Sequence, residues 1–91
     1  MWYNNFSMAK VEIYTKNYCP YCHAAKELFK DRGVEFVEYD VENDPAKREE
    51  MLKRAHPRTS VPEIFINDKL IGGFDDLQAL DDDGKLDEML A

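Results

Sequence analysis

Cys19 and Cys22 are the residues of this chain whose type and spacing suit a specific chemistry. They are separated by Pro20 and Tyr21, within a stretch 16–22 that comes directly after an apolar run at 11–15 and directly before a helical pattern. A cysteine pair at such a strand-to-helix junction is typical of thiol–disulfide redox motifs. Proline suits the first position of a helix, where its missing N–H costs nothing. We therefore expect Cys19 at the N-cap of a helix and Cys22 one turn further on.

This placement predicts different roles for the two thiols. The thiolate is the nucleophile in disulfide exchange, and the positive end of a helix together with Lys16 favours a thiolate at Cys19. Cys22 is expected to face the body of the protein and to remain a thiol at rest. Cys19 would then attack a disulfide, and Cys22 would resolve the mixed disulfide by attacking Cys19.

Two other uses of a cysteine pair compete with redox chemistry. The pair can be half of a zinc site, with His23 and His56 as completing ligands, but the chain has no second cysteine pair. The pair can also form a static structural disulfide, which is typical of secreted proteins rather than of a chain without secretory features. Redox chemistry is the favoured interpretation.

Length and charge limit the classes of function. The 91 residues, 44% of them hydrophobic, predict one small domain with a modest core. The net charge is −7, and residues 75–91 hold seven acidic residues and one lysine, a balance of −6 that leaves about −1 for the remainder. Nucleic-acid binding needs clustered Lys and Arg, so we expect no nucleic-acid partner. The acidic C-terminal part is interpreted as a solvated face that aids solubility.

The N-terminal segment predicts neither export nor membrane insertion. Residues 1–7 have no basic residue and no long apolar stretch, so no signal peptide is expected. No apolar run approaches the ~20 residues that cross a bilayer. We expect a cytoplasmic protein, where a cysteine pair is more often catalytic than structural. Met8 could be the natural start, and the predicted domain is 8–91, with 1–7 as an extension or an added segment.

The order of elements predicts the fold class. The expected elements are a strand at 10–15, a helix at 20–32 ended by Gly33, a strand at 34–41, a helix at 45–55, a hairpin of 64–66 with 70–71, a helix capped by Asp75 or Asp76 that runs to about 80, and a last short helix with Leu86, Met89 and Leu90. A right-handed β-α-β unit followed by a hairpin gives an α/β protein. The prediction is a thioredoxin-like fold with a four-stranded mixed sheet flanked by helices on both faces.

From residue 8 to residue 91 the chain resembles a dithiol glutaredoxin of the small bacterial type. The motifs that carry the resemblance are Val11-Glu12-Ile13-Tyr14-Thr15-Lys16, Cys19-Pro20-Tyr21-Cys22-His23, Ala46-Lys47-Arg48-Glu49-Glu50-Met51, Arg58-Thr59-Ser60-Val61-Pro62 and Ile71-Gly72-Gly73-Phe74-Asp75-Asp76-Leu77. Their order and spacing along nearly the whole chain are more specific than one cysteine pair.

The resemblance implies a glutathione-dependent disulfide oxidoreductase. It would reduce glutathione mixed disulfides and protein disulfides, with glutathione as reducing co-substrate and no tightly bound cofactor. The implied partners are glutathione and glutathionylated or disulfide-containing proteins, with ribonucleotide reductase as one example, and the implied state is a monomer.

The resemblance also implies a glutathione groove. Pro62 would be a cis proline that presents the backbone of Val61 to the tripeptide. The first N–H groups of the helix after Gly73 would bind a glutathione carboxylate, and Asp76 would pair with the α-amino group or simply cap the helix. The expected glutathione-binding residues are Lys16, Tyr21, Thr59, Ser60, Val61, Pro62, Gly73, Phe74, Asp75 and Asp76, with Arg58 beside Thr59 at the approach.

The sequence departs from the common family pattern at two positions. Ser60 stands where the family more often has threonine, and Phe74 follows the glycines where some relatives carry a polar residue or a third cysteine.

Two rival functions compete with this interpretation. One rival is a glutaredoxin-like redoxin reduced by thioredoxin reductase. The other is an iron–sulfur carrier in which Cys19 and glutathione from two subunits hold a cluster, which the stiff turn at Pro20 disfavours.

Overall fold

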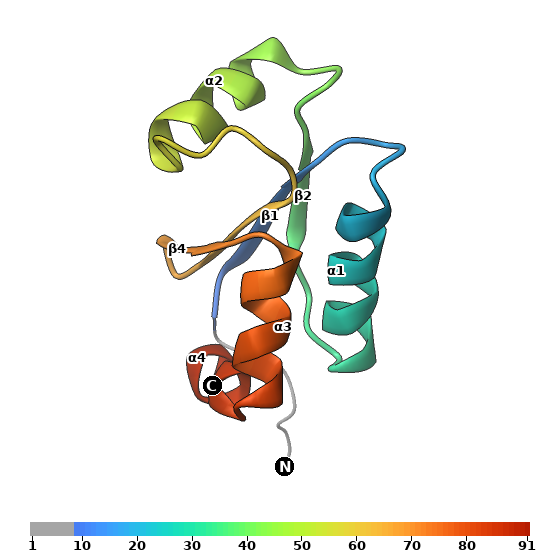
Figure 1. The fold of residues 1–91 in the computed structure, drawn as a ribbon, viewed down its shortest axis with the longest axis vertical. Coiled ribbons are helices and arrows are strands. Elements are labelled where there is room, and N and C mark those ends of the chain that lie inside the picture. Colours follow the sequence, from blue (N-terminus) through green and yellow to red (C-terminus); the bar gives the residue numbers. More distant parts are fainter. Residues whose placement is uncertain (1–8) are drawn as a thin grey trace.

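The structure is a computed structural model that describes residues 9–91, so the expected boundary after residue 7 lies outside the described residues. The elements, in order, are β1 (Val11–Thr15), α1 (Pro20–Asp31), β2 (Val37–Asp40), α2 (Pro45–Arg54), β3 (Glu63–Ile66), β4 (Lys69–Gly72), α3 (Phe74–Asp82) and α4 (Lys85–Leu90) (Figure 1). This order agrees with the prediction from the sequence.

One four-stranded mixed sheet forms the centre of the domain, in the order β2-β1-β3-β4. The β1–β2 pair is parallel, while β1–β3 and β3–β4 are antiparallel. The parallel pair is joined by α1, as a β-α-β crossover requires. The antiparallel β3–β4 pair turns at Asn67 and Asp68, whose positive φ angles of 52° and 66° suit a two-residue hairpin turn.

The two faces of the sheet bury different side chains. Successive residues of a strand point to opposite faces, so Ile13 of β1 and Ile64 of β3 pack with α1, α3 and α4, whereas Tyr14 and Phe65 pack under α2. In Figure 1, α1 and α3 lie side by side and α2 lies apart from them. The helices therefore flank both faces, as predicted.

The second strand is shorter than predicted. Residues 34–36 are not paired in the sheet, and the strand covers only Val37–Asp40. Val34 is nevertheless buried, and the ring of Phe36 lies 6.0 Å from that of Phe29 in α1. Val34 and Phe36 are apolar because they pack against α1, and an apolar run does not distinguish such packing from strand pairing.

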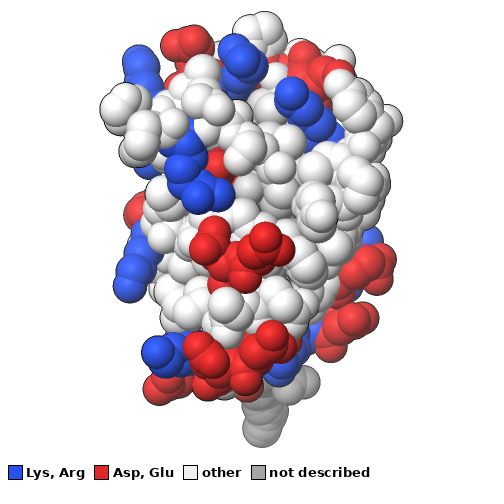
Figure 2. Space-filling view, in the orientation of Figure 1, with Lys and Arg blue, Asp and Glu red and all other residues white. Residues whose placement is uncertain are grey.

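Acidic side chains gather on the surface at one end of the molecule. Figure 2 shows them at the lower end, where α3 and α4 lie in Figure 1. Asp82, Asp83, Asp87 and Glu88 of this region are exposed. The arrangement agrees with the solvated face expected from the sequence.

A buried ion pair joins α2 to the middle of the sheet. Glu12 of β1 is only 3% exposed, and Arg54 at the end of α2 donates to both of its oxygens, Nη2 to Oε1 at 3.0 Å and Nη1 to Oε2 at 3.1 Å. Arg54 also donates to the Tyr14 hydroxyl at 2.7 Å, and the Tyr39 hydroxyl donates to Glu12 at 2.9 Å. Burial opposes ionisation of Glu12, but the hydrogen bonds from Arg54 and Tyr39 outweigh it and hold the pKa of this carboxyl below its usual value.

Substitution of Arg54 by Met is expected to destabilise the fold by about 3–5 kcal/mol, because Glu12 would remain buried without its cation. The double variant Glu12→Gln with Arg54→Met should recover part of that loss, since it leaves no charge unpaired. Urea denaturation measures the free energy of unfolding of both variants.

The matched control is Arg32→Met, which removes the ion pairs of the α1 C-cap residue with Asp81 and Asp87. The Arg32 side chain is 38% exposed, so its loss should cost about 1 kcal/mol or less. Equal losses for the two arginines would contradict the role given to Glu12.

Candidate functional site

Cys19 occupies the N-cap of α1, as the sequence predicts. Its backbone is extended, with φ −96° and ψ 111°, and Pro20 follows at the first helical position. The Cys22 N–H donates to Cys19 Sγ at 3.2 Å. The Cys19 N–H donates to the Lys16 carbonyl at 3.4 Å, which closes the loop from β1. The sulfur therefore receives one of the free N–H groups of the first helical turn.

Cys22 differs from Cys19 in its surroundings, as expected. It is fully buried, whereas Cys19 is partly exposed, and both are free thiols. Burial, together with the neighbouring Cys19, raises the pKa of the Cys22 thiol to about 12. The exposed member of the pair is thus the one that a disulfide can reach, and the buried member holds its proton.

The loop before β3 lies against Cys19. The Val61–Pro62 peptide bond is cis, as the resemblance implied, and a second cis bond, His56–Pro57, precedes it in the same loop. The Cys19 thiol points to the Val61 carbonyl, with 3.9 Å between Sγ and the oxygen. Two segments 42 residues apart are thereby brought together at one thiol.

A groove of about 390 Å³ lies beside this loop and the start of α3. Eight of the ten predicted glutathione-binding residues line it, and so does Arg58. Lys16 and Thr59 do not line it, although Lys16 lies in the loop that carries Cys19. The lining residues are Tyr21, Arg58, Ser60, Val61, Pro62, Gly73, Phe74, Asp75 and Asp76.

Two aromatic rings stand at this groove. The ring centroids of Tyr21 and Phe74 are 6.2 Å apart, and their planes are inclined by 28°. Tyr21 is 62% exposed, so one face of the groove is apolar while remaining open to solvent. Phe74 occupies the position where the sequence analysis noted a polar residue or a cysteine in relatives.

The start of α3 differs from the prediction. Gly73, not Asp75 or Asp76, is the N-cap, and Asp76 is the third helical residue. The Asp76 carboxylate reaches back to accept the Gly73 N–H at 3.0 Å. Because this carboxylate satisfies a free N–H from inside the helix, the N-cap residue needs no side chain of its own.

The sequence of this chain shows the family to which it belongs. The family model described as glutaredoxin matches residues 11–71, from β1 into β4. The chain belongs to the glutaredoxin family. It is 58% identical over 83 residues to Glutaredoxin 3 of Escherichia coli (strain K12), a match that covers 91% of this chain and 99% of that protein. It is 44% identical over 84 residues to Glutaredoxin of Pseudomonas aeruginosa, which covers 92% of this chain and 99% of that protein.

Solved glutaredoxin structures share the fold. The buckwheat glutaredoxin–glutathione complex has a TM-score of 0.81 at 30% identity, and the match covers 92% of this chain and 78% of that one. The solution structure of glutaredoxin from Brucella melitensis has a TM-score of 0.77 at 49% identity, with 92% and 90% covered. The protein therefore has the predicted thioredoxin-like fold, and as a glutaredoxin it is a thiol–disulfide oxidoreductase.

Glu63 contacts this glutaredoxin site through Arg58, and the sequence analysis missed it. It is the first residue of β3 and is fully buried. Arg58 donates through Nε to both carboxylate oxygens, at 3.0 and 3.1 Å, and burial raises the pKa of this carboxyl. The sequence does contain a signal that could have indicated Glu63, namely an acidic residue at the start of the apolar strand 63–66 and a few residues after an arginine.

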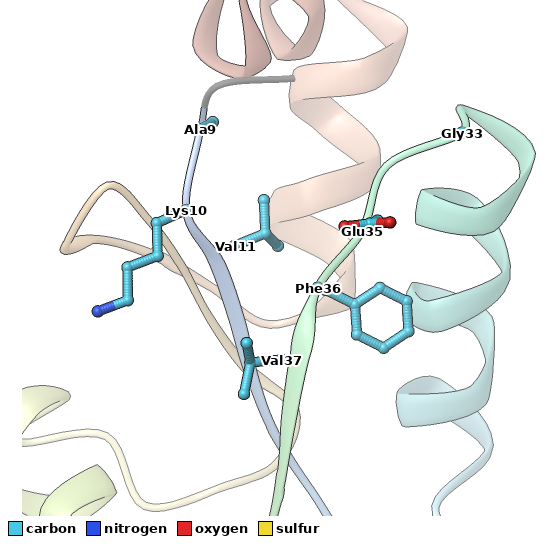
Figure 3. Close-up of a pocket in the computed structure, with 7 residues that line it drawn as sticks. All are labelled: Ala9, Lys10, Val11, Gly33, Glu35, Phe36 and Val37. Atoms are coloured by element: carbon cyan, nitrogen blue, oxygen red, sulfur yellow. The ribbon is translucent and has the colours of Figure 1, made fainter. Parts of the chain in front are cut away.

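A second hollow, of about 420 Å³, lies at the opposite end of the strands from Cys19 (Figure 3). Its lining residues are Ala9, Lys10, Val11, Gly33, Glu35, Phe36 and Val37. The ring of Phe36 turns toward α1, and the amine of Lys10 points away on the other side. No cysteine is among these lining residues, so the thiol chemistry belongs to the groove beside Cys19.

Among residues 9–91, no group of three or more His, Cys, Asp or Glu side chains has an arrangement that could hold a metal ion. No helix in this part of the chain has the length and apolar character needed to span a membrane.

Substitution of Gly72 by Ala is expected to destabilise the fold by about 2–3 kcal/mol. Gly72 has φ +117°, and an added Cβ would collide with the Asp76 carboxylate that caps α3. Urea denaturation measures the loss. Gly33→Ala is the matched control, because Gly33 also has a positive φ but has nothing within 4 Å of the added Cβ. It should cost at least about 1 kcal/mol less, and equal costs would contradict the collision at Asp76.

Glu63→Gln is expected to gain stability relative to the native protein as the pH rises from about 4 to about 7. Since the folded-state pKa of Glu63 is raised, the folded protein holds a proton more tightly than the unfolded chain above the usual pKa near 4.5. The native protein therefore loses stability as the pH rises through the folded pKa, and glutamine has no such loss. Urea denaturation across this range measures the difference, with exposed Glu49→Gln as control. If the native protein instead gained stability relative to Glu63→Gln as the pH rises, the raised pKa of Glu63 would be contradicted.

Proposed function

We propose that this glutaredoxin is a glutathione-dependent oxidoreductase that reduces glutathione mixed disulfides and protein disulfides. The observation that carries the proposal is the groove formed by Tyr21, the cis Val61–Pro62 loop and the start of α3, which lies beside the partly exposed thiol of Cys19. One structural neighbour, the buckwheat glutaredoxin, was solved as a complex with glutathione, which supports glutathione as the ligand of this groove.

The backbone around Val61 suits an extended peptide. Its N–H and C=O would pair with the tripeptide as an added strand does, and the position of the Val61 carbonyl near Cys19 Sγ would place the glutathione sulfur at the nucleophile. Tyr21 would cover the reacting sulfurs from one side. Lys16, in the loop before Cys19, would bind the glycine carboxylate, while Thr59 and Ser60 would flank the approach.

The start of α3 suits the other end of the tripeptide. The first N–H groups of α3, at Phe74 and Asp75, would bind the carboxylate of the γ-glutamyl residue. Asp76, which is exposed and already accepts the Gly73 N–H, would pair with the α-ammonium group. The absence of a side chain at Gly73 lets the ligand approach the backbone closely.

One cysteine is sufficient for glutathione mixed disulfides. The Cys19 thiolate attacks the glutathionyl sulfur, the substrate leaves as a thiolate that takes up a proton, and glutathione remains bonded to Cys19. A second glutathione, as thiolate, attacks the glutathionyl sulfur and leaves with it as glutathione disulfide, which restores the Cys19 thiolate. The Cys22 N–H that points at Cys19 Sγ stabilises the negative sulfur in both steps.

Protein disulfides need the second cysteine. Cys19 attacks one sulfur of the substrate, and Cys22 then loses its proton and attacks Cys19 Sγ, which releases the reduced substrate and leaves a Cys19–Cys22 disulfide. Two glutathione molecules reduce that disulfide. Glutaredoxin potentials of about −200 to −230 mV lie close enough to the cytosolic glutathione pool for this pool to drive turnover.

The proposed compartment, oligomeric state and partners are those expected from the sequence. The protein would act in the cytoplasm as a monomer, on glutathionylated or disulfide-containing proteins, of which ribonucleotide reductase is one candidate. It would need no tightly bound cofactor.

Turnover of a glutathionylated peptide, coupled to glutathione reductase and NADPH, tests the proposal. Cys19→Ser should reduce the rate to background, because it removes the nucleophile. Cys22→Ser should retain turnover of the glutathionylated peptide but lose turnover of a protein disulfide, because it removes only the resolving thiol. An inactive native protein, or a Cys19→Ser variant with native activity, would contradict the proposal, and thioredoxin reductase would then be the electron source to try.

A further inference from the structure

A further hollow, of about 400 Å³, lies between α1 and α3 and adjoins the groove beside Cys19. Phe74, the first residue of α3, lines both of them, and its ring lies 6.2 Å from that of the exposed Tyr21. Both helices begin at the groove and run side by side away from it (Figure 1). A peptide that leaves Cys19 past Phe74 would therefore enter this α1–α3 hollow.

Apolar side chains form part of the α1–α3 hollow. Ala24 and Leu28 line it from α1, where they lie one helical turn apart on the same face. Phe74 lines it from α3, and all three residues are partly exposed. Such a surface suits the methylene stem of a long basic side chain, because the stem covers the apolar atoms while the charged head stays in water.

The rim of the α1–α3 hollow carries negative charge that nothing nearby balances. Glu27 and Asp31 of α1 line it and are exposed. In the described part of the chain, no ion pair or side-chain hydrogen bond engages either carboxylate. Arg32 also lines the hollow, but its guanidinium already pairs with Asp81 and Asp87. The two carboxylates of α1 are therefore available to a cation from outside.

These two carboxylates do not stabilise the helix that carries them. Glu27 and Asp31 are four residues apart, so they lie on one face of α1, where like charges repel. Asp31 is also the last residue of α1, and the negative end of a helix dipole disfavours an anion there. Because neither position helps the fold, a cationic partner gives them a use.

The distances suit a substrate chain that is attached at Cys19. Glu27 and Asp31 follow this N-cap residue by eight and twelve residues, which is about 12 and 18 Å along the helix axis at about 1.5 Å per residue. An extended peptide advances about 3.3 Å per residue. Its residues about four to six positions from the reacting cysteine would reach the two carboxylates.

We propose that the α1–α3 hollow binds a lysine or arginine of the protein substrate, about four to six residues from its reactive cysteine. The stem of that side chain packs on Leu28 and Phe74, and its charged head lies at Glu27 and Asp31. This inference rests on the proposed function and specifies its substrate class, namely reactive cysteines in basic segments. The net charge of −7 attracts such segments at longer range.

The test compares two short peptides, each with one central glutathionylated cysteine between serine and glycine spacers. One carries lysines at the fourth and fifth positions on both sides of the cysteine, and the other carries glutamines there. The quantity measured is the ratio of their kcat/KM values, basic over neutral. The variant is Glu27→Gln with Asp31→Asn. The control is Glu35→Gln with Glu49→Gln, which removes the same net charge from exposed positions outside the α1–α3 hollow.

The native protein should give a ratio of about five at low salt, through a lower KM for the basic peptide, as expected for two exposed ion pairs. In about 0.5 M salt the ratio should fall towards one, because exposed charges are screened. Glu27→Gln with Asp31→Asn should lower the low-salt ratio to below about two and leave turnover of the neutral peptide at the native rate. The control should keep a ratio of about five.

Three results would overturn the inference. A native ratio near one would show that the protein does not select basic segments, and an unchanged ratio in the α1 double variant would place the selection elsewhere. An equal fall in the α1 double variant and in the control would show an effect of net charge alone. A native protein that turns over neither peptide would overturn the proposed function as well, which distinguishes that failure from the other three.

Discussion

The hydrogen bond from the Cys22 N–H to Cys19 Sγ is the contact on which the site depends. It exists because Cys19 is the N-cap of α1, and Cys19 is the N-cap because Pro20 begins the helix after the short loop that follows β1. The same turn buries Cys22, so one local feature makes one thiol accessible and the other inaccessible. Parallel pairing of β1 with β2 and antiparallel pairing of β1 with β3 then bring the Val61–Pro62 loop to that thiol. Without the N-cap placement, Cys19 Sγ would receive no N–H from the first turn of α1.

Two buried carboxylates show how differently this small domain uses charge. Glu12 accepts from two nitrogens of Arg54 and from the Tyr39 hydroxyl, and its pKa is lowered. Glu63 accepts from one nitrogen of Arg58, and burial raises its pKa. The fully satisfied pair lies between α2 and the sheet, away from the groove, and stabilises the fold. The less satisfied pair lies at the groove, where Arg58 Nη2 is also 3.8 Å from Asp76 Oδ2.

Most of the fold and the placement of the two cysteines could be predicted from the sequence, because they rest on local signals. Strand alternation, helical spacing, and the placement of Pro20 and Gly33 indicated the order of elements. The cis bond at Pro62 and the groove residues came from the family resemblance, since no local pattern indicates them. Two predictions were wrong: that residues 34–36 pair in the second strand, and that Asp75 or Asp76 caps the third helix. Both depend on contacts in the folded protein, namely the packing of Val34 and Phe36 against α1 and the reach of the Asp76 carboxylate to the Gly73 N–H. The Arg58–Glu63 pair was missed for the same reason, as it forms only when the loop before β3 folds back.

The most direct test of the account is the rate at which each thiol takes up glutathione in a single step. Reduced Cys22→Ser and Cys19→Ser variants would each be mixed with glutathione disulfide near neutral pH, quenched by alkylation at short times and analysed by mass spectrometry. The account predicts that Cys22→Ser acquires one glutathionyl group at Cys19, about tenfold or more faster than Cys19→Ser acquires one at Cys22, since the latter thiol is buried and holds its proton. Equal rates, or faster reaction at Cys22, would contradict the assignment of Cys19 as the nucleophile.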